Sequence, residues 1–311
     1  MTLSALRLTP SPPEQPLSIC EQTRQWIRSV INLSDEAMKK LDREKITDLI
    51  TGTFPEPGSQ EVLQLTCDWT TLFCCLDDYL ENFTDINELK AYLKELFDVY
   101  NGSKDASSIT PFTIGMANIG RRIKELAPHL AAEFTARLTA LFSAFMSEAR
   151  YRITGSTPEL EEYLAIREVT VGLRTGFILG LAIQNIDLPL EILEDDTIKA
   201  IERSTCIIVG LENDICTAEK ELRNGEVNNA VIIFMQTRLS FEDAVAKVNG
   251  LRNENIAELE RLIEEFSHNP HYEPEVQSKV MNYVEMVTAY IQSHNTWSER
   301  TGRYIMVCDV A

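Results

Sequence analysis

The chain contains neither an apolar run long enough to cross a membrane nor a cysteine pattern typical of disulfides or zinc sites. Its seven cysteines are an odd number, and no two of them are spaced as Cys-x-x-Cys. These features indicate reduced thiols in a reducing compartment. The longest apolar run, at residues 177–183, is far shorter than the ~20 residues of a membrane span. We therefore expect a soluble, cytoplasmic protein without stable membrane insertion.

Basic residues are scarce in this chain. Lysine and arginine total 29 against 48 for aspartate and glutamate, which gives a formal net charge of −19 at pH 7. This is the wrong sign for holding a polyanion by counterion release, which argues against nucleic acid as a partner. An acidic chain that binds an anionic ligand needs divalent cations or clustered arginines between the two.

Signals for β-strands are also missing. Apolar residues recur at spacings of three and four instead, as at Phe134, Leu138, Leu141 and Phe145, which is the period of a helix with one buried face. The pattern predicts an all-α fold of around ten helices without internal repeats. Residues 1–18 hold four prolines and no continuous apolar segment, so we expect a Pro-rich flexible segment there, not a signal peptide. Residues 19–311 are expected to form a single α-helical domain.

Three carboxylates, Asp77, Asp78 and Glu81, follow the apolar segment 72–76 and are here called the acidic motif. Taken alone, acidic residues on a helix of so acidic a chain usually form a solvated face. The preceding apolar segment weakens that reading, because it predicts a helix that is buried up to the carboxylates. The acidic pair at 195–196 serves as a contrast, since capping and the helix dipole explain it at a helix start.

A second group, Asn213, Thr217 and Glu221, is here called the oxygen ladder. These residues stand at i, i+4 and i+8, so on a helix they project from one face with a drift of roughly 40° per step. An ordinary polar helix face is the plain alternative, but the apolar segment 206–211 before them indicates burial. Mg²⁺ takes oxygen ligands from protein and substrate phosphates. Two oxygen-bearing faces opposed across a cavity would hold such ions, which would recruit a diphosphate.

Two arginines suit phosphate recognition by their planar, bidentate guanidinium. Arg167 precedes three glycines within residues 172–180, and Arg303 stands beside Tyr304. By themselves both arginines would be assigned to surface ion pairs. Each glycine costs roughly 1 kcal/mol in a helix interior, so the glycine cluster predicts a helix break or a close backbone contact.

Two aromatic residues stand near these groups. Phe73 lies one helical turn before Asp77, and Trp297 lies about two turns before Tyr304. Both are candidates to line a cavity and to stabilise a cation by their π faces, and simple core packing explains each equally well. The four histidines show no metal-ligand spacing, and the chain contains no Gly-x-Ser-x-Gly or Gly-rich phosphate loop.

Taken together, these motifs resemble those of the microbial class I terpene synthases. The acidic motif matches the form DDxxE, residues 213–221 match NDxx(S/T)xxxE, and Arg303-Tyr304 matches a pair near the carboxyl end. Arg167 precedes Asn213 by 46 positions (213 − 167), a spacing similar to that of the family's diphosphate-sensing arginine. Three and four positions after that arginine the family frequently has an acidic residue and a glycine, and this chain has Thr-Val at 170–171.

The resemblance implies a single class I terpenoid synthase-type helical bundle around an apolar active-site cavity. It implies three Mg²⁺ ions, for which Mn²⁺ can substitute, and metal ligands from both motifs: Asp77, Asp78, Glu81, Asn213, Thr217 and Glu221. It also implies substrate contacts, with the two aromatic candidates added: Arg167, Lys220, Arg303, Tyr304, Phe73 and Trp297. Catalytic roles fall to Asp77, Arg167, Arg303 and Tyr304.

The predicted function is that of a Mg²⁺-dependent lyase that ionises a linear isoprenoid diphosphate, farnesyl diphosphate, and cyclises the carbocation to a sesquiterpene. A diterpene synthase that uses geranylgeranyl diphosphate stays open, because cavity depth cannot be read from sequence. A chain-elongating prenyltransferase should carry two Asp-rich motifs, and this chain has one. A catalytically silent helical binding protein is the alternative from another class. Homodimers are common in the family, so a homodimer is a further expectation.

Overall fold

The regular structure is entirely helical in the computed structural model, which describes residues 17–107, 109–268 and 272–304. Thirteen α-helices and two short 3₁₀-helices occur among these residues. In chain order they are α1 (Ile19–Val30), α2 (Asp35–Glu44), α3 (Ile46–Thr53), α4 (Gln60–Leu80), α5 (Ile86–Asn101), α6 (Thr113–Leu126), η1 (Pro128–Leu130), α7 (Ala131–Thr154), α8 (Leu160–Thr170), α9 (Leu173–Ile183), η2 (Leu190–Glu194), α10 (Asp196–Asn224), α11 (Ala230–Met235), α12 (Phe241–His268) and α13 (Pro274–Ser298). The predicted all-α class is confirmed.

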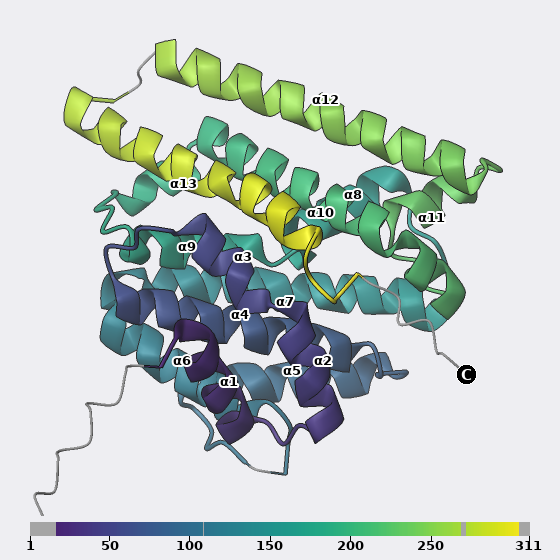
Figure 1. Ribbon diagram of the computed structural model, residues 1–311, viewed down its shortest axis with the longest axis horizontal. Coiled ribbons are helices and arrows are strands. Elements are labelled where there is room, and N and C mark those ends of the chain that lie inside the picture. Colours follow the sequence, from purple (N-terminus) through teal and green to yellow (C-terminus); the bar gives the residue numbers. More distant parts are fainter. Residues whose placement is uncertain (1–16, 108, 269–271, 305–311) are drawn as a thin grey trace, which may run out of the picture.

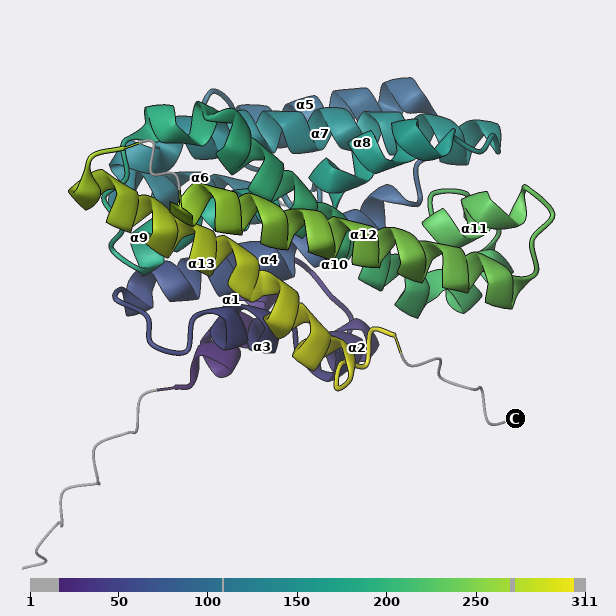
Figure 2. The same ribbon diagram turned by 90° about the horizontal axis from the view of Figure 1, so that it is seen from above.

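Two long helices, α4 and α10, organise the bundle. Helix α4 packs against α1, α3, α6 and α9, while α10 packs against α8, α12 and α13. Helix α12 runs along one edge of the bundle, and α1 and α2 lie at the opposite edge (Figure 1). The view from above places α5 and α7 on one side and α1, α2 and α3 on the other (Figure 2). None of the described helices is both long enough and apolar enough to span a membrane.

Helix α4 forms a firmly packed platform for the acidic motif. Leu72 and Leu76, which precede Asp77, are both 0% exposed. Full burial of such a side chain stabilises the fold by roughly 1.5 to 3 kcal/mol. The N-cap residue before this helix is Ser59, whose side chain accepts a hydrogen bond from the Val62 N–H. The predicted burial up to the carboxylates is thus found at Leu72 and Leu76, whereas residues 73–75 between them are half-buried.

The glycine cluster produces both effects that were predicted for it. Gly172 adopts a left-handed backbone, with φ 79°, and separates α8 from α9. A Cβ atom at Gly172 would lie 2.5 Å from the Phe73 ring. One turn further, a Cβ atom at Gly176 would lie 2.6 Å from the Tyr290 hydroxyl oxygen. The chain thus breaks at the first glycine and admits a close aromatic contact at the second.

The structure differs from two sequence-based expectations, around ten helices and a last helix that runs from about residue 273 to Tyr304. The described residues form thirteen α-helices, more than the expected ten or so, partly because Lys45 takes a left-handed conformation that separates α2 from α3. The last helix ends at Ser298, so Arg303 and Tyr304 lie beyond it. The Thr301 hydroxyl donates to the Glu44 carbonyl oxygen at 2.6 Å, which holds the segment after α13 against the corner between α2 and α3.

The acidic pair at 195–196 has the structural role expected of it. The Asp195 carboxylate accepts from the N–H groups of Thr197 and Ile198 and caps α10. The expected Pro-rich segment, residues 1–18, lies outside the described residues apart from its last two. That residues 19–311 form a single domain stays a prediction.

Candidate active site

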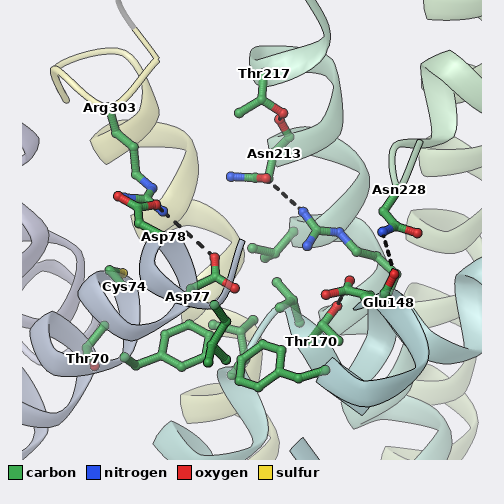
Figure 3. A pocket seen from close by; sticks show the side chains of 18 of the residues that line it. Thr70, Cys74, Asp77, Asp78, Glu148, Thr170, Asn213, Thr217, Asn228 and Arg303 are labelled. Atoms are coloured by element: carbon green, nitrogen blue, oxygen red, sulfur yellow. Dashed lines mark hydrogen bonds and ion pairs between the residues drawn. The ribbon is translucent and has the colours of Figure 1, made fainter. Parts of the chain in front are cut away.

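All the candidate residues named from the sequence line one pocket of about 220 Å³. Its walls come from α3, α4, α5, α7, α8, α9, α10, α13 and the segments after α10 and α13. Figure 3 shows Asp77 and Asp78 of α4 across the pocket from Asn213 and Thr217 of α10. The candidates in the lining are Phe73, Asp77, Asp78, Glu81, Arg167, Asn213, Thr217, Lys220, Glu221, Trp297, Arg303 and Tyr304. Residues more than two hundred positions apart in sequence thus share one cavity.

The pocket has an apolar side formed largely by aromatic rings. Phe73 stacks on Phe145 with ring centroids 6.1 Å apart and an interplanar angle of 18°. Trp69 adds a tilted contact with Phe73, at 6.2 Å between ring centroids. Tyr290 also lines the pocket and is 1% exposed, and its hydroxyl has no hydrogen-bond partner among the described residues. This side offers π faces and very few polar atoms.

The two aspartates of the acidic motif have different electrostatic surroundings. Asp78 accepts from Arg303 at 2.8 Å and from Lys40 at 3.0 Å; burial opposes ionisation, but these two cations lower the pKa of Asp78. Asp77 lies 3.9 Å from the Arg303 guanidinium. Partial burial raises the pKa of Asp77 to about 8, with Glu148 acting in the same direction and Arg303 opposing it. Of the two aspartates, Asp77 is therefore the one less closely paired with a cation.

The remaining member of the acidic motif lies at the pocket rim. Glu81 follows the last residue of α4 and is exposed, as is Lys220 on α10. Both line the pocket. Partial desolvation by the surrounding pocket wall raises the pKa of Glu81, as does the Asp78 charge, while Lys220 acts in the opposite direction. The rim therefore carries one acidic and one basic side chain at its opening.

The oxygen ladder presents three oxygen-bearing side chains along α10. The Asn213 Oδ1 atom accepts from Arg167 at 2.7 Å, and its Nδ2 donates to the Tyr304 hydroxyl at 2.6 Å. The Thr217 hydroxyl donates to the Asn213 carbonyl oxygen at 2.9 Å, which leaves lone pairs of the hydroxyl oxygen available. Glu221 accepts from Asn229 at 2.9 Å, and burial raises its pKa.

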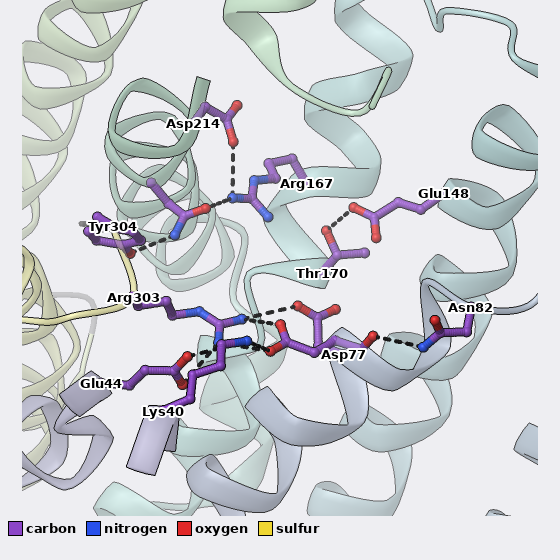
Figure 4. A network of polar contacts seen from close by, with 12 residues as sticks. Lys40, Glu44, Asp77, Asn82, Glu148, Arg167, Thr170, Asp214, Arg303 and Tyr304 are labelled. Atoms are coloured by element: carbon purple, nitrogen blue, oxygen red, sulfur yellow. Dashed lines mark hydrogen bonds and ion pairs between the residues drawn. The ribbon is translucent and has the colours of Figure 1, made fainter. Parts of the chain in front are cut away.

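Arg167 lies flat along α10 and is held there by Asp214 (Figure 4). Its guanidinium is 3.0 Å from the Asp214 carboxylate, which in turn accepts from the Tyr163 hydroxyl at 2.5 Å. A Cβ atom at Gly210 would lie 3.1 Å from Arg167 Cγ, so the glycine leaves room for the arginine stem. The Nε atom of Arg167 is buried without a hydrogen-bond partner among the described residues. Arg167 is thus anchored on one side and keeps donor capacity.

Sequence reasoning missed a half-buried carboxylate, Glu148 of α7, which lines the pocket. It accepts from the Thr170 hydroxyl at 2.6 Å, at the end of α8 (Figure 4). Burial raises the pKa of Glu148 to about 7, against the effects of Arg167 and the Thr170 hydrogen bond. A signal was present: Glu148 stands three positions after Phe145 and so continues the apolar stripe of α7. A carboxylate on the buried face of a helix indicates a site.

The donor set fits a hard divalent cation. The described residues contain no group of three His, Cys, Asp or Glu side chains that could hold a metal. The pocket instead offers single carboxylates together with an amide and a hydroxyl oxygen, from Asp77, Glu221, Asn213 and Thr217. Mg²⁺ is commonly bound by one or two carboxylates plus substrate phosphates and water. Asp77, which is less closely paired with a cation than Asp78, and the oxygen ladder are the residues that could hold such an ion.

Comparison with known proteins decides the family. The profile of "Terpene synthase family 2, C-terminal metal binding" matches residues 68–258, more than half of the chain. The chain belongs to the terpene synthase family. The class I assignment and its all-α fold are thereby confirmed, and the matched region is described as metal-binding. It holds both the acidic motif and the oxygen ladder.

Individual terpene synthases support this assignment. The chain is 26% identical over 303 residues to a 10-epi-cubebol synthase of Sorangium cellulosum, covering 95% of this chain and 94% of that protein. It is 26% identical over 245 residues to "Sesquiterpene synthase 3" of Postia placenta, covering 78% of this chain and 66% of that protein. A solved structure of hedycaryol synthase shares the fold with a TM-score of 0.76 at 19% identity, covering 90% of this chain and 92% of that one.

Proposed function

We propose that this terpene synthase is a Mg²⁺-dependent cyclase that converts farnesyl diphosphate to a sesquiterpene with release of diphosphate. The observation that carries the proposal is the shared pocket. It brings Asp77, the oxygen ladder and two arginines, Arg167 and Arg303, to one end, and aromatic rings to the other. A pocket with a cationic and oxygen-rich end beside an apolar end matches a substrate with a diphosphate head and a hydrocarbon tail.

The residues proposed to hold Mg²⁺ are those of the acidic motif on α4 and of the oxygen ladder on α10. Asp77 is the leading ligand on its side, because Asp78 is already paired with Arg303 and Lys40. Three ions, as the resemblance implies, would offset the negative charge of the site and of the diphosphate together. When bound, the metal would act as a Lewis acid that stabilises the negative charge on the departing diphosphate.

The protein's own cations are proposed to bind and orient the diphosphate. Arg167 and Arg303 can donate bidentately to phosphate oxygens, and Lys220 lies at the pocket rim as a further donor. The Tyr304 hydroxyl lies beside Asn213 at the same end. In the reaction the allylic C–O bond breaks, and its electron pair leaves with the diphosphate oxygen. Fixed donors aimed at that oxygen stabilise the developing charge.

The apolar side of the pocket is proposed to fold and protect the carbocation. Phe73, Phe145 and Tyr290 offer ring faces in the pocket, and Trp297 lines it beside Tyr304. An aromatic face attracts a cation within about 6 Å of its centroid. Exclusion of water from such a cavity also prevents premature hydrolysis of the reactive intermediate.

Farnesyl diphosphate is the favoured substrate for two reasons. The cavity of about 220 Å³ leaves less room for the longer chain of geranylgeranyl diphosphate than for that of farnesyl diphosphate. One of the reported relatives is also named a sesquiterpene synthase. The oxygen ladder in place of a second Asp-rich motif disfavours a chain-elongating prenyltransferase.

The test is a substrate screen with purified protein. Geranyl, farnesyl and geranylgeranyl diphosphates are incubated with Mg²⁺ or with EDTA, and the hexane extracts are analysed by mass spectrometry. We expect a cyclic fifteen-carbon product from farnesyl diphosphate that EDTA abolishes. Longer diphosphates on addition of isopentenyl diphosphate would indicate a prenyltransferase, and no conversion of any substrate would contradict the proposal.

A further inference from the structure

The hydroxyl of Tyr304 lies between two polar groups on different elements. It accepts from Asn213 Nδ2 of α10 at 2.6 Å. On its other side it lies 3.1 Å from His294 Nε2 of α13. All three side chains line the pocket. The contacts therefore connect a proposed metal ligand to a histidine that no motif includes.

The direction of these hydrogen bonds follows from counting donors. Because Asn213 Oδ1 accepts from Arg167 at 2.7 Å, the other amide atom is the NH₂ group, and it must donate to Tyr304. The tyrosine oxygen then accepts from Asn213, and its single proton is free to donate. His294 Nε2 is the atom within reach of that proton, so the geometry assigns Nε2 the role of acceptor.

The second ring nitrogen supports the same tautomer. His294 Nδ1 is buried without a hydrogen-bond partner among the described residues, and it lies 3.6 Å from the Glu212 carboxylate. A ring N–H pointing at a carboxylate is attractive, whereas a lone pair pointing there is repulsive. The His294 side chain is only 5% exposed, and that of Glu212 is 12% exposed. This burial strengthens the preference for a proton on Nδ1, because little water is present to screen the Glu212 charge.

We propose that His294 is a positioning residue for the Asn213 amide and acts through the Tyr304 hydroxyl. Asparagine can present either its oxygen or its nitrogen to a ligand, because the two ends of the amide are nearly equal in shape. An acceptor fixed behind the NH₂ group keeps Oδ1 directed toward Arg167 and the pocket. Oδ1 has two lone pairs, so one stays available to a cation. This inference rests on the proposed function, which makes Asn213 a metal ligand.

The tyrosine ring is itself held in place by aromatic packing. Trp297 makes an edge contact with Tyr304, with ring centroids 5.4 Å apart, and His294 lies 5.6 Å from Trp297 by the same measure. The Trp297 N–H donates to the carbonyl oxygen of Glu44 at 2.9 Å. The hydroxyl is thus fixed by packing on one side and by the histidine on the other. Loss of the histidine alone should therefore leave the ring in place and free the hydroxyl.

The test measures Mg²⁺ binding and does not depend on turnover. Thermal unfolding is followed with a fixed amount of inorganic diphosphate while Mg²⁺ is titrated, since a ligand that binds only the folded protein raises the melting temperature. His294→Phe removes the acceptor, whereas His294→Gln supplies an amide oxygen that can accept. Loss of a residue that orients a metal ligand typically costs about 10- to 100-fold in affinity. We expect His294→Phe to raise the half-saturating Mg²⁺ concentration by that factor. In His294→Gln this concentration should stay close to the wild-type value.

Two further variants separate positioning from packing. Tyr304→Phe should raise the half-saturating Mg²⁺ concentration similarly, and the double variant should be no worse than Tyr304→Phe alone, because His294 acts through the tyrosine. Ser293→Ala is the matched control on the same helix. Its hydroxyl donates to the Leu49 carbonyl oxygen at 2.7 Å, so its loss should lower the melting temperature and leave the Mg²⁺ response unchanged.

The results that would contradict this inference differ from those that would contradict the proposed function. Two results would overturn this inference and leave the proposed function standing. One is an unchanged Mg²⁺ response in His294→Phe. The other is a double variant whose half-saturating Mg²⁺ concentration is raised by the product of the two single effects. An absent Mg²⁺ response in the wild-type protein would overturn the proposed function and the inference together.

Discussion

Gly210 determines how closely Arg167 can approach α10. The substitution Gly210→Ala should favour the stability of the fold and lower the activity of the site. A Cβ atom at this position would lie 3.1 Å from Arg167 Cγ and 3.3 Å from its Nε. The arginine must move by a few tenths of an ångström, although Asp214 and Asn213 hold its guanidinium at 3.0 and 2.7 Å. At the same time, alanine favours a helix interior over glycine by about 1 kcal/mol. The variant should therefore be at least as stable as the wild-type protein, while its Arg167 guanidinium is displaced.

The size of the functional effect follows from what Arg167 is proposed to do. A hydrogen bond to a charged group is worth roughly 1.5 to 3 kcal/mol, and each 1.36 kcal/mol changes a rate about tenfold. We therefore expect Gly210→Ala to lower kcat about 10- to 100-fold. Arg167→Ala should lower it further, because the cation is lost entirely.

The chain supplies a matched control in Gly250, which lies within α12 and where an added Cβ atom would have nothing within 4 Å. Gly250→Ala should raise the melting temperature by about 2 °C and leave kcat unchanged. The assay is steady-state turnover of farnesyl diphosphate beside thermal unfolding for both variants. A Gly210→Ala enzyme with wild-type kcat would mean that Arg167 does not have the role described above.

Three further results are expected. Asn213→Ala or Glu221→Ala should abolish product formation with an unchanged circular dichroism spectrum, and normal turnover in either variant would contradict the metal assignment. Because the pKa of Asp77 is raised to about 8, this carboxyl holds a proton at pH 7 that Mg²⁺ must displace. Affinity should rise with pH toward 8 and then level off. Calorimetry of Mg²⁺ binding in buffers of different ionisation enthalpy should show that the wild-type protein releases a proton and that Asp77→Asn does not. Equal binding heats in all buffers would contradict a protonated Asp77. Gly176→Ala should alter the product mixture, because its methyl group would meet the Tyr290 hydroxyl, and an unchanged mixture would remove Tyr290 from the cavity's shaping residues.

The local parts of the site could be predicted from sequence because helical spacing is local. The i, i+4, i+8 spacing placed Asn213, Thr217 and Glu221 on one side of α10, and all three line the pocket. The glycines after Arg167 likewise predicted the break between α8 and α9. These inferences need only the 3.6-residue period and the cost of glycine in a helix.

Contacts between different helices could not be predicted from helical spacing. Nothing in the spacing shows that Thr170 donates to Glu148, because the two residues belong to different helices whose packing decides the contact. The path of the chain after α13 was also missed, since a hydrogen bond from Thr301 to the Glu44 carbonyl turns it away from the helix axis. The contact between His294 and Tyr304 follows from that turn.

The proposed function depends above all on the acidic motif and the oxygen ladder holding divalent ions around a prenyl diphosphate. A crystal structure with Mn²⁺ and inorganic diphosphate tests this without an assumption about the product, because anomalous scattering locates the metal. We expect peaks beside Asp77 and beside Asn213, Thr217 and Glu221, with the diphosphate between them and Arg167. Peaks elsewhere in the protein, or diphosphate bound without metal at these residues, would show that the metal assignment is wrong.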